Sequence, residues 1–299
     1  MRIAGGLAAG AVVAGLVVAG GAAAPAARAA AGTAAVPEQA AAPAGVKSRW
    51  AELANAATGA NLWSRSSTLE RPMGSITKVM TAYVVLTTPG VNLNRVITVP
   101  KGIVAYDAGG ASTAGLRPGE RYTAMQLLYA MMLPSGCDAA YTLANAYGPG
   151  ISGFVAKMNA AARTLGMTKT HFTDPSGLPV PGGYSTYSTA HDLIVLGRVA
   201  MRNRTFANIV AARGYRLTGG SAHHAHAWAN LDPLLGTVPG AIGIKTGYTG
   251  AAGQCLLFEV KRGSTTLIGV VLDSSGVNSP SLAAAASDAT AMLDWGFSR

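Results

Sequence analysis

The chain has 299 residues, 49% of them apolar, and a formal charge of +10. Its length allows one large domain or two small ones with an ample core, and its two cysteines, Cys137 and Cys255, are too few for a disulfide scaffold. The basic residues are scattered without an aromatic-basic module, which argues against a nucleic-acid partner and leaves anionic surfaces or plain solubility to explain the charge.

The N-terminal segment has the features of an export signal. Met1-Arg2 precedes an uncharged run of Ala, Gly, Val and Leu over residues 3–24, and Ala27-Arg28-Ala29 matches an A-x-A cleavage site. We predict a secretory signal peptide over 1–29, with a retained membrane anchor as the alternative, because the run nearly spans a bilayer. An Ala/Pro-rich linker is predicted over 30–45. We therefore expect a secreted, extracytoplasmic protein without a stable membrane anchor, whose charge favours wall polymers or lipid headgroups.

Two strands and a helix are predicted next. Segments 49–54 and 61–64 alternate in a way typical of a hairpin, with a turn-like stretch over 57–60 between them. A helix is predicted over 76–86, and Ser75 lies at its N-terminus, where free backbone N–H groups favour negative charge.

The middle of the chain is predicted to be mostly helical, after irregular stretches over 92–100 and 116–121. Thr123 is a suitable N-cap for the first of these helices, and Thr189 with Asp192 forms a capping box for the last. Segment 174–177 is predicted to be a turn that shapes a cleft. The predicted helices cover 124–133, 138–147, 154–165 and 190–201.

The β pattern returns from about Tyr215. Three consecutive strands and a closing Ala-rich helix are predicted over 241–246, 253–261, 265–272 and 280–297. This order predicts an α/β unit interrupted by a helical insertion. The α/β subdomain would comprise 46–97 and 205–299, and the all-helical subdomain 98–204.

Three short motifs could carry chemistry. Ser75-Ile76-Thr77-Lys78 places a serine and a lysine on one helix face, and a neutral lysine amine can take the proton of a serine hydroxyl. Ser135-Gly136-Cys137 stands at a helix break 60 residues after Ser75, and Lys245-Thr246-Gly247 lies in a strand 110 residues after Ser135. Each motif alone is weak, but the three in this order indicate acyl transfer on a serine.

The order of motifs is similar to that of penicillin-recognising serine enzymes. Among them, the chain resembles the low-molecular-mass D-alanyl-D-alanine carboxypeptidases and transpeptidases of peptidase family S11. The similarity runs over about 50–297 and includes the connecting segments 71–80, 133–136, 171–178 and 243–247.

The resemblance implies a role for each motif. Ser75 would attack the carbonyl of a D-Ala-D-Ala peptide and become acylated, with Lys78 as general base. Ser135 would relay a proton to the leaving D-alanine nitrogen. Lys245 and Thr246 would bind the terminal carboxylate of the substrate.

Backbone groups and one thiol complete the implied substrate-binding set. The N–H groups of Ser75 and Tyr248, which follows Gly247, would form the oxyanion hole. The family's second motif is usually Ser-x-Asn, and Cys137 replaces that asparagine here, as in a subset of small Gram-positive DD-transpeptidases. A thiol is a poor substitute for an amide, so transpeptidation gains weight over hydrolysis. Cys137 and Cys255 are expected to be free thiols, with a single disulfide as the alternative.

The resemblance further implies a β-lactamase/DD-peptidase-like fold of the α/β (α+β) class. This fold is an antiparallel sheet flanked by helices plus an all-helical subdomain, with the active site in the cleft between them. Peptidoglycan stem peptides would be the substrates and β-lactams covalent inhibitors. The protein would be a monomer that needs no cofactor and no metal.

Two other functions stay open. A serine β-lactamase would need a carboxylate that activates a deacylating water, and no Glu-x-x-x-Asn segment follows Ser135. A non-catalytic wall-binding protein of the same fold is the second alternative, against which the intact motifs argue. His223-His224-x-His226 offers three imidazoles without a carboxylate or thiol close in sequence, so a solvated loop is favoured over a metal site. His171 and His191 are expected to be structural.

Overall fold

The computed structural model describes residues 42–104, 111–179, 186–274 and 281–299. The predicted signal peptide over 1–29 lies outside the described residues, as do most of the predicted linker and the first residue of the predicted closing helix. Within the described part, no helix is both long enough and apolar enough to cross a membrane.

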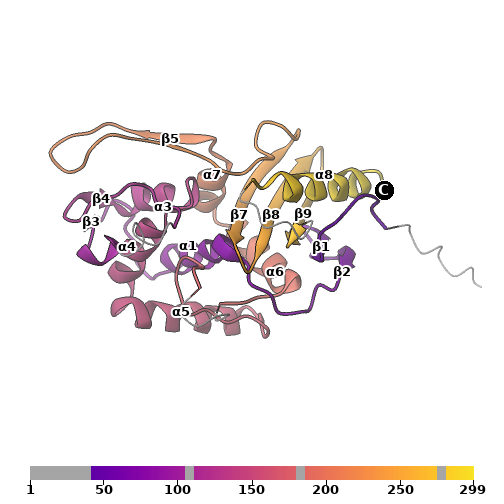
Figure 1. Ribbon diagram of the computed structural model, residues 1–299, viewed down its shortest axis with the longest axis horizontal. Helices are drawn as coiled ribbons and strands as arrows, with labels where there is room; N and C mark the ends of the chain where they lie inside the picture. Colours follow the sequence, from indigo (N-terminus) through magenta and orange to yellow (C-terminus); the bar gives the residue numbers. More distant parts are fainter. Residues whose placement is uncertain (1–41, 105–110, 180–185, 275–280) are drawn as a thin grey trace, which may run out of the picture. The chain divides into compact units, whose positions relative to one another are not determined.

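A five-stranded antiparallel sheet in the order β2-β1-β9-β8-β7 forms one half of the fold (Figure 1). The strands are β1 (Trp50–Asn55), β2 (Asn61–Arg65), β7 (Ala241–Thr249), β8 (Gly253–Arg262) and β9 (Thr265–Leu272). The predicted N-terminal hairpin and the three predicted C-terminal strands are confirmed. Strands from both ends of the chain meet in the middle, where β1 pairs with β9.

The two faces of the sheet carry different helices. Leu256 and Phe258 of β8 point into an apolar layer with α8 (Ala283–Phe297), whereas Leu257 between them belongs to the core on the other side. Successive side chains of a strand alternate between faces, so a strand covered on both sides is apolar almost throughout. On that other side α6 (Ala190–Met201) packs against the sheet.

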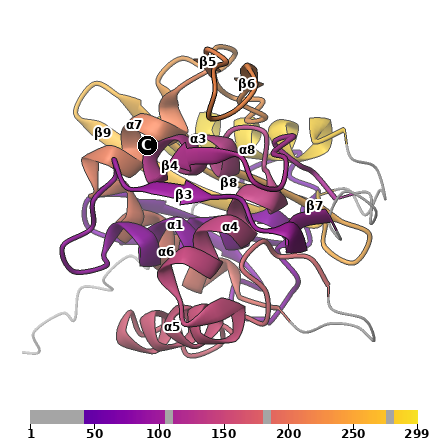
Figure 2. The same ribbon diagram turned by 90° about the vertical axis from the view of Figure 1, so that its left-hand side faces the viewer.

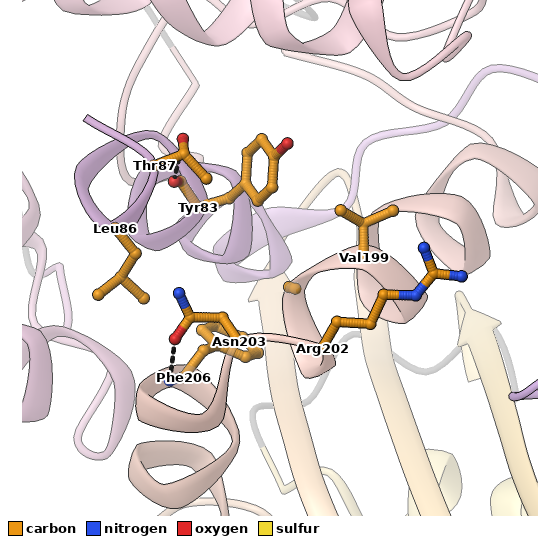
Figure 3. Close-up of a pocket in the computed structure, with 8 residues that line it drawn as sticks. Tyr83, Leu86, Thr87, Val199, Arg202, Asn203 and Phe206 are labelled. Atoms are coloured by element: carbon orange, nitrogen blue, oxygen red, sulfur yellow. Dashed lines mark hydrogen bonds between the residues drawn. The ribbon is translucent and has the colours of Figure 1, made fainter. Parts of the chain in front are cut away.

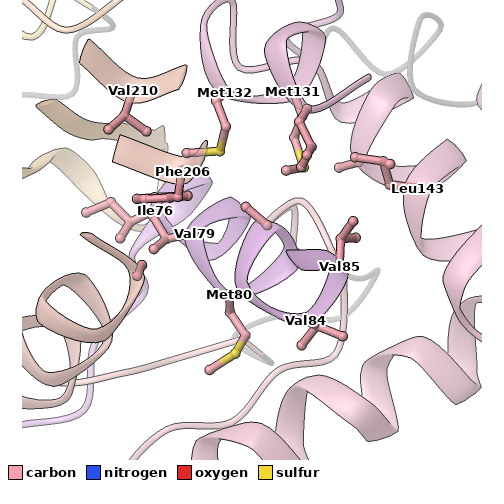
Figure 4. Close-up of a cluster of buried hydrophobic side chains, with 14 of the residues drawn as sticks. Ile76, Val79, Met80, Val84, Val85, Met131, Met132, Leu143, Phe206 and Val210 are labelled. Carbon is pink, nitrogen blue, oxygen red and sulfur yellow. The ribbon is translucent and has the colours of Figure 1, made fainter. Parts of the chain in front are cut away.

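The second half of the fold surrounds the buried helix α1 (Lys78–Leu86). Figure 4 shows its side chains in contact with residues of α3, α4 and α7, and nearly every position of α1 is buried. A helix that is apolar on all sides must be enclosed on all sides, which fixes its start in space. The surrounding helices are α3 (Ala124–Met132), α4 (Cys137–Tyr147), α5 (Gly150–Thr164) and α7 (Arg204–Ala211).

Capping residues set several helix starts as predicted. The Thr123 side chain accepts a hydrogen bond from Gln126 N in a full capping box at α3. At α6, Thr189 accepts from Asp192 N, but the Asp192 carboxylate accepts from Thr170 Oγ1 at 2.7 Å instead of completing the box.

Some elements differ from the sequence prediction. The stretch 92–100, predicted to be irregular, contains β3 (Val96–Thr98). Its partner β4 (Arg121–Thr123) begins at the last residue of the other such stretch, 116–121, and η2 (Lys101–Ile103) follows β3. The helix α7 was not predicted, although Asn203 caps it through its side chain. A further hairpin consists of β5 (Gly214–Leu217) and β6 (His226–Ala229).

The division into an α/β subdomain and an all-helical subdomain stays a prediction. A separate hollow of about 310 Å³ is lined by residues of α1, α6 and α7 and of the turn between α6 and α7, among them Tyr83, Leu86, Val199 and Phe206. Figure 3 shows these side chains. None of the motif residues lines it, so it is distinct from the candidate site.

Candidate active site

The first motif lies at the turn that leads into α1. Ser75 is in the 3₁₀ helix η1 (Gly74–Thr77), and Lys78 is the first residue of α1. Lys78 Nζ lies 2.8 Å from Ser75 Oγ, as the three-residue spacing predicts. Ser75 is half-buried, whereas Lys78 is 0% exposed. The nucleophile candidate can therefore meet a substrate while the lysine beside it is shielded from water.

Lys78 has two further partners. Its Nζ lies 3.0 Å from the main-chain oxygen of Ser176 and 3.4 Å from Cys137 Sγ. Cys137 is 59 residues away in sequence and Ser176 is 98. Packing of α4 and of the 174–177 turn against α1 therefore assembles the surroundings of the lysine. The sequence interpretation did not name Ser176, because a main-chain acceptor leaves no residue-type signal.

The predicted turn over 174–177 is present and holds the Ser176 carbonyl in place. Asp174 Oδ1 accepts hydrogen bonds from the N–H groups of Ser176 at 2.7 Å and Gly177 at 2.8 Å. Thr81 of α1 donates to the carbonyl oxygen of Pro175 at 2.6 Å. Gly177 has a φ of +88°, and a Cβ there would lie 2.1 Å from Gly74 O. Only glycine permits this close approach between the turn and η1.

The second motif forms the break between α3 and α4. Ser135 has a φ of +64°, an uncommon conformation for a residue with a side chain. It is 3% exposed, and its Oγ has no hydrogen-bond partner among the residues that the structure describes. Cys137 and Cys255 are both buried and free, as expected. An unpaired hydroxyl in a strained backbone conformation is typical of a functional position.

Asp138 anchors the break from the side of α4. Its carboxylate accepts hydrogen bonds from Ala114 N at 2.9 Å and Leu116 N at 2.9 Å. In the same segment, Cys137 N donates to Ser112 O at 2.8 Å. These bonds attach 112–116 to the start of α4 and so fix the direction of the Ser135 turn.

The third motif lies on β7, the edge strand of the sheet next to η1. Lys245 is 2% exposed, and its Nζ donates to Thr246 O at 3.2 Å and to Thr246 Oγ1 at 3.3 Å. The pKa of Lys245 is lowered to about 7, chiefly by burial, and a charge on the nearby Lys78 contributes in the same direction. The two lysines of the predicted site are thus electrostatically coupled.

Asp232 is a buried carboxylate that the sequence interpretation missed. It is 5% exposed, its Oδ1 accepts from Leu234 N at 2.9 Å, and its Oδ2 has no partner among the described residues. Burial raises the pKa of Asp232 to about 6, and the charge of Lys245 opposes this rise. No spacing rule links the two residues, so only the fold reveals their proximity.

Glycines bring β7 and η1 into backbone contact. A Cβ on Gly247 would lie 2.3 Å from Met73 O, and one on Gly74, whose φ is +53°, would lie 2.8 Å from Tyr248 N. The main chain of Tyr248 therefore lies against the turn that carries Ser75. This arrangement suits an oxyanion hole made of the two N–H groups, which stays a prediction.

The structure thus brings all three motifs together, and it separates the remaining histidines from them. His191 contacts Glu52 through Nδ1 at 3.1 Å, and His171 pairs with Tyr187 in an isolated bridge. No carboxylate stands close in sequence to the imidazoles at 223–226, but the fold brings one to them. Glu120 Oε1 accepts a hydrogen bond from His224 N at 3.0 Å across 104 residues.

Comparison with known proteins gives a consistent result. A family model described as D-alanyl-D-alanine carboxypeptidase, peptidase S11, matches residues 37–276. A D-alanyl-D-alanine carboxypeptidase of Streptomyces sp. strain K15 is 40% identical over 254 residues, which cover 81% of this chain and 84% of that protein. D-alanyl-D-alanine carboxypeptidase DacB2 of Mycobacterium tuberculosis is 40% identical over 255 residues, which cover 85% of this chain and 84% of that protein.

A solved structure supports the same fold. The crystal structure of the Streptomyces K15 DD-transpeptidase is 38% identical, with a TM-score of 0.80, and the match covers 87% of this chain and 100% of that one. The predicted fold class, an antiparallel sheet flanked by helices with further helices beside it, is confirmed.

Proposed function

The chain belongs to peptidase family S11, the D-alanyl-D-alanine carboxypeptidases, and we propose that it forms an acyl-enzyme on Ser75 with peptides that end in D-Ala-D-Ala. The observation that carries this proposal is the 2.8 Å contact between Ser75 Oγ and the buried Nζ of Lys78. A serine becomes a nucleophile when a base within hydrogen-bond distance takes its proton.

The partners of Lys78 suit a neutral amine acting as that base. A neutral amine has two N–H groups and one lone pair, enough for the three contacts of Nζ, whereas a protonated amine would use an N–H group in each and could not accept the serine proton. The Ser176 carbonyl can only accept, and the Cys137 thiol donates towards Ser135 O at 3.9 Å, so both receive N–H groups from Lys78. The lone pair is left for the Ser75 hydroxyl, whose proton it accepts as Oγ attacks the substrate carbonyl.

The negative charge that develops on the substrate oxygen needs donors held in advance. The N–H groups of Ser75 and Tyr248 would provide them, since Gly74 and Gly247 allow β7 to lie against η1. These donors need no rearrangement during the reaction, because the main chains of η1 and β7 that carry them are packed against each other.

Proton delivery to the leaving group would involve Ser135. Its buried, unpartnered Oγ can accept a proton from one neighbour and donate one to the D-alanine nitrogen. Lys245 and Thr246 would bind the terminal carboxylate of the substrate, which restricts the enzyme to free C-terminal ends. Asp232 would favour the charged form of Lys245.

The acyl-enzyme can be resolved by water or by an amine. Water gives carboxypeptidation, and an amine from a second stem peptide gives a cross-link. Because the Cys137 thiol stands where a family amide is usual, we propose transpeptidation as a substantial part of the activity. We propose peptidoglycan stem peptides as substrates, β-lactams as covalent inhibitors, and the cell wall outside the cytoplasm as the location.

Mass spectrometry of the intact protein after brief exposure to benzylpenicillin tests the assignment of Ser75. We expect one stable adduct on the parent and none on Ser75→Ala. An unmodified parent with hydrolysed penicillin would indicate a β-lactamase instead. An unmodified parent with intact penicillin would indicate a non-catalytic protein of this fold.

A further inference from the structure

A group of imidazoles and a carboxylate lies outside the cleft, where β4 meets the β5–β6 hairpin. Glu120 directly precedes β4, His224 lies in the hairpin loop, and His226 is the first residue of β6. The loop is attached to β4 by a main-chain bond from Arg121 N to Ala222 O at 2.9 Å. Figure 2 shows this hairpin at the top of the molecule. The catalytic proposal uses none of these residues.

We infer that Glu120, His224 and His226 form a binding site for a divalent transition-metal ion of the Zn²⁺ type. One potential ligand atom of each residue lies within 4.8 Å of those of the other two. Among the described residues, no other three His, Cys, Asp or Glu side chains meet in this way. Two histidines and a glutamate are a donor set that binds Zn²⁺ and leaves a coordination position open. Imidazole nitrogen also suits Cu²⁺ and Ni²⁺, so these ligands define a class of divalent transition-metal ions rather than one metal.

Two of the ligand atoms, His224 Nδ1 and Glu120 Oε1, face each other closely enough to share one ion. His224 Nδ1 lies 2.5 Å from Glu120 Oε1, a distance that requires a proton between them. A metal ion would take the place of that proton, and His224 would carry its hydrogen on Nε2 instead. Metal–ligand bonds of about 2.1 Å would widen the separation to roughly 3.3 Å. That change needs only a small side-chain movement.

Tyr122 fixes the orientation of the other two ligands. Its hydroxyl donates to Glu120 Oε2 at 2.7 Å, and its oxygen lies 2.7 Å from His226 Nε2. Because the hydroxyl gives its one proton to the carboxylate, it accepts the Nε2 hydrogen of His226. This tautomer leaves His226 Nδ1 without a proton, the form that a metal requires. Hydrogen bonds of this kind orient ligands and conserve their geometry.

The group is open to solvent on one side. The side chains of His224 and Glu120 are 32% and 14% exposed, and they line a surface hollow together with Arg117 and His223. His223 stacks on the Tyr122 ring at 4.7 Å, beside the three ligands. Water could complete the coordination, while the charge of Arg117 moderates the affinity for a cation. A bound ion would tie the hairpin to β4.

Isothermal titration of ZnCl₂ into the untagged, EDTA-stripped full chain tests this site. We expect one equivalent bound by the parent, and affinity lowered at least about tenfold in Glu120→Gln and in His224→Ala. The exposed histidine variants His171→Ala and His191→Ala are the matched controls and should bind like the parent. Zn²⁺ should also raise the melting temperature of the parent but not of the two site variants.

Other outcomes would overturn the proposal. These are no binding by a folded parent, unchanged binding by both site variants, or equal losses in the His171→Ala and His191→Ala controls. Circular dichroism and the benzylpenicillin adduct show whether each variant is folded. Should Glu120→Gln fail to fold, His224→Ala decides, because His224 lies in a half-exposed loop.

Discussion

The layer between the sheet and α8 differs from the candidate active site between β7 and α1 in what it buries. In the layer, Leu53, Phe258 and Leu293 are fully buried, and burying each such side chain contributes about 1.5–3 kcal/mol to stability. In the candidate active site, Lys78 and Lys245 are also buried, and a buried charge or unpaired polar group lowers stability.

The difference indicates that the layer raises the free energy of unfolding and that the candidate active site lowers it. Two polar side chains are buried beside the sheet here. Gln254 Oε1 accepts from Ala284 N at 3.0 Å, and Asp288 of α8 accepts from Lys47 N at 2.8 Å through Oδ1, while its Oδ2 has no partner among the described residues. The candidate active site adds Ser135 Oγ and Asp232 Oδ2, which also lack partners in the described part of the chain, to its two buried lysines. The regular layer therefore offsets the cost of groups that are kept ready for a substrate.

Loss of the proposed base should have the largest effect on chemistry. Lys78→Met keeps the side chain long and removes the amine, so the rate of acylation by benzylpenicillin should fall by about 10²–10⁴-fold. The melting temperature should not fall, because a buried amine is replaced by an apolar group. Stopped-flow acylation and thermal melts check both statements. Acylation within tenfold of the parent would reject Lys78 as the base.

A substitution in the layer should have the opposite profile. Phe258→Ala removes a fully buried ring that contacts Gly269, and we expect it to lower the free energy of unfolding by about 3–5 kcal/mol. Acylation of the protein that remains folded should proceed at the parental rate. Urea denaturation and acylation kinetics on the same samples check this. A rate loss as large as that of Lys78→Met would contradict the separation of the two regions.

The positive φ of Ser135 should cost stability, and a glycine at this position should recover that cost. Ser135→Gly relieves the positive φ and should be more stable than Ser135→Ala by about 1 kcal/mol, because only glycine adopts that conformation at no cost. Both variants should turn over D-Ala-D-Ala peptides more slowly than the parent. Chemical denaturation of the pair measures the strain, and equal stabilities would show that there is none.

Binding of the substrate carboxylate should depend on pH through Lys245. The pKa of Lys245 is lowered to about 7, so the side chain is charged below that pH and neutral above it. Affinity of the non-reacting Ser75→Ala variant for a D-Ala-D-Ala peptide should therefore fall as pH rises through 7, by up to about tenfold per unit. Calorimetry from pH 6 to 9 measures it. Arginine keeps its positive charge over this pH range, so adding Lys245→Arg should abolish the pH dependence of the affinity. An unchanged pH dependence in that double variant would refute the assignment to Lys245.

The smallest effect is expected at Cys137. Its thiol lies 3.4 Å from Lys78 Nζ, a weak hydrogen bond, so Cys137→Ala should change the acylation rate by less than about tenfold. Acylation by benzylpenicillin measures this. A larger loss would mean that the thiol directs the Lys78 amine rather than filling space.

Much of the fold could be predicted from the sequence. Segments with a strong apolar pattern formed as expected: β8 and β9 are nearly continuous apolar runs that are buried on both faces, and α3 has the 3.6-residue period of a helix. The short strands β3 and β4 and the helix α7 were missed. Three-residue strands carry too few residues for a period, so packing rather than propensity decides them. The helix α7 did carry a signal, because the N-cap Asn203 is followed by the apolar residues Phe206, Ile209 and Val210 at helical spacing, but the prediction did not use it.

The sequence alone determined the order of the motifs, the chemistry they offer and the family to which they belong. Spacing within a helix made Ser75 and Lys78 neighbours, because residues three apart share a face. Only the tertiary structure decided that the Ser176 carbonyl meets Lys78, that Asp232 acts on Lys245, and that Glu120 joins His224. These pairs are joined through turns and loops whose path is set by the packing of the whole molecule, and no local rule encodes such contacts.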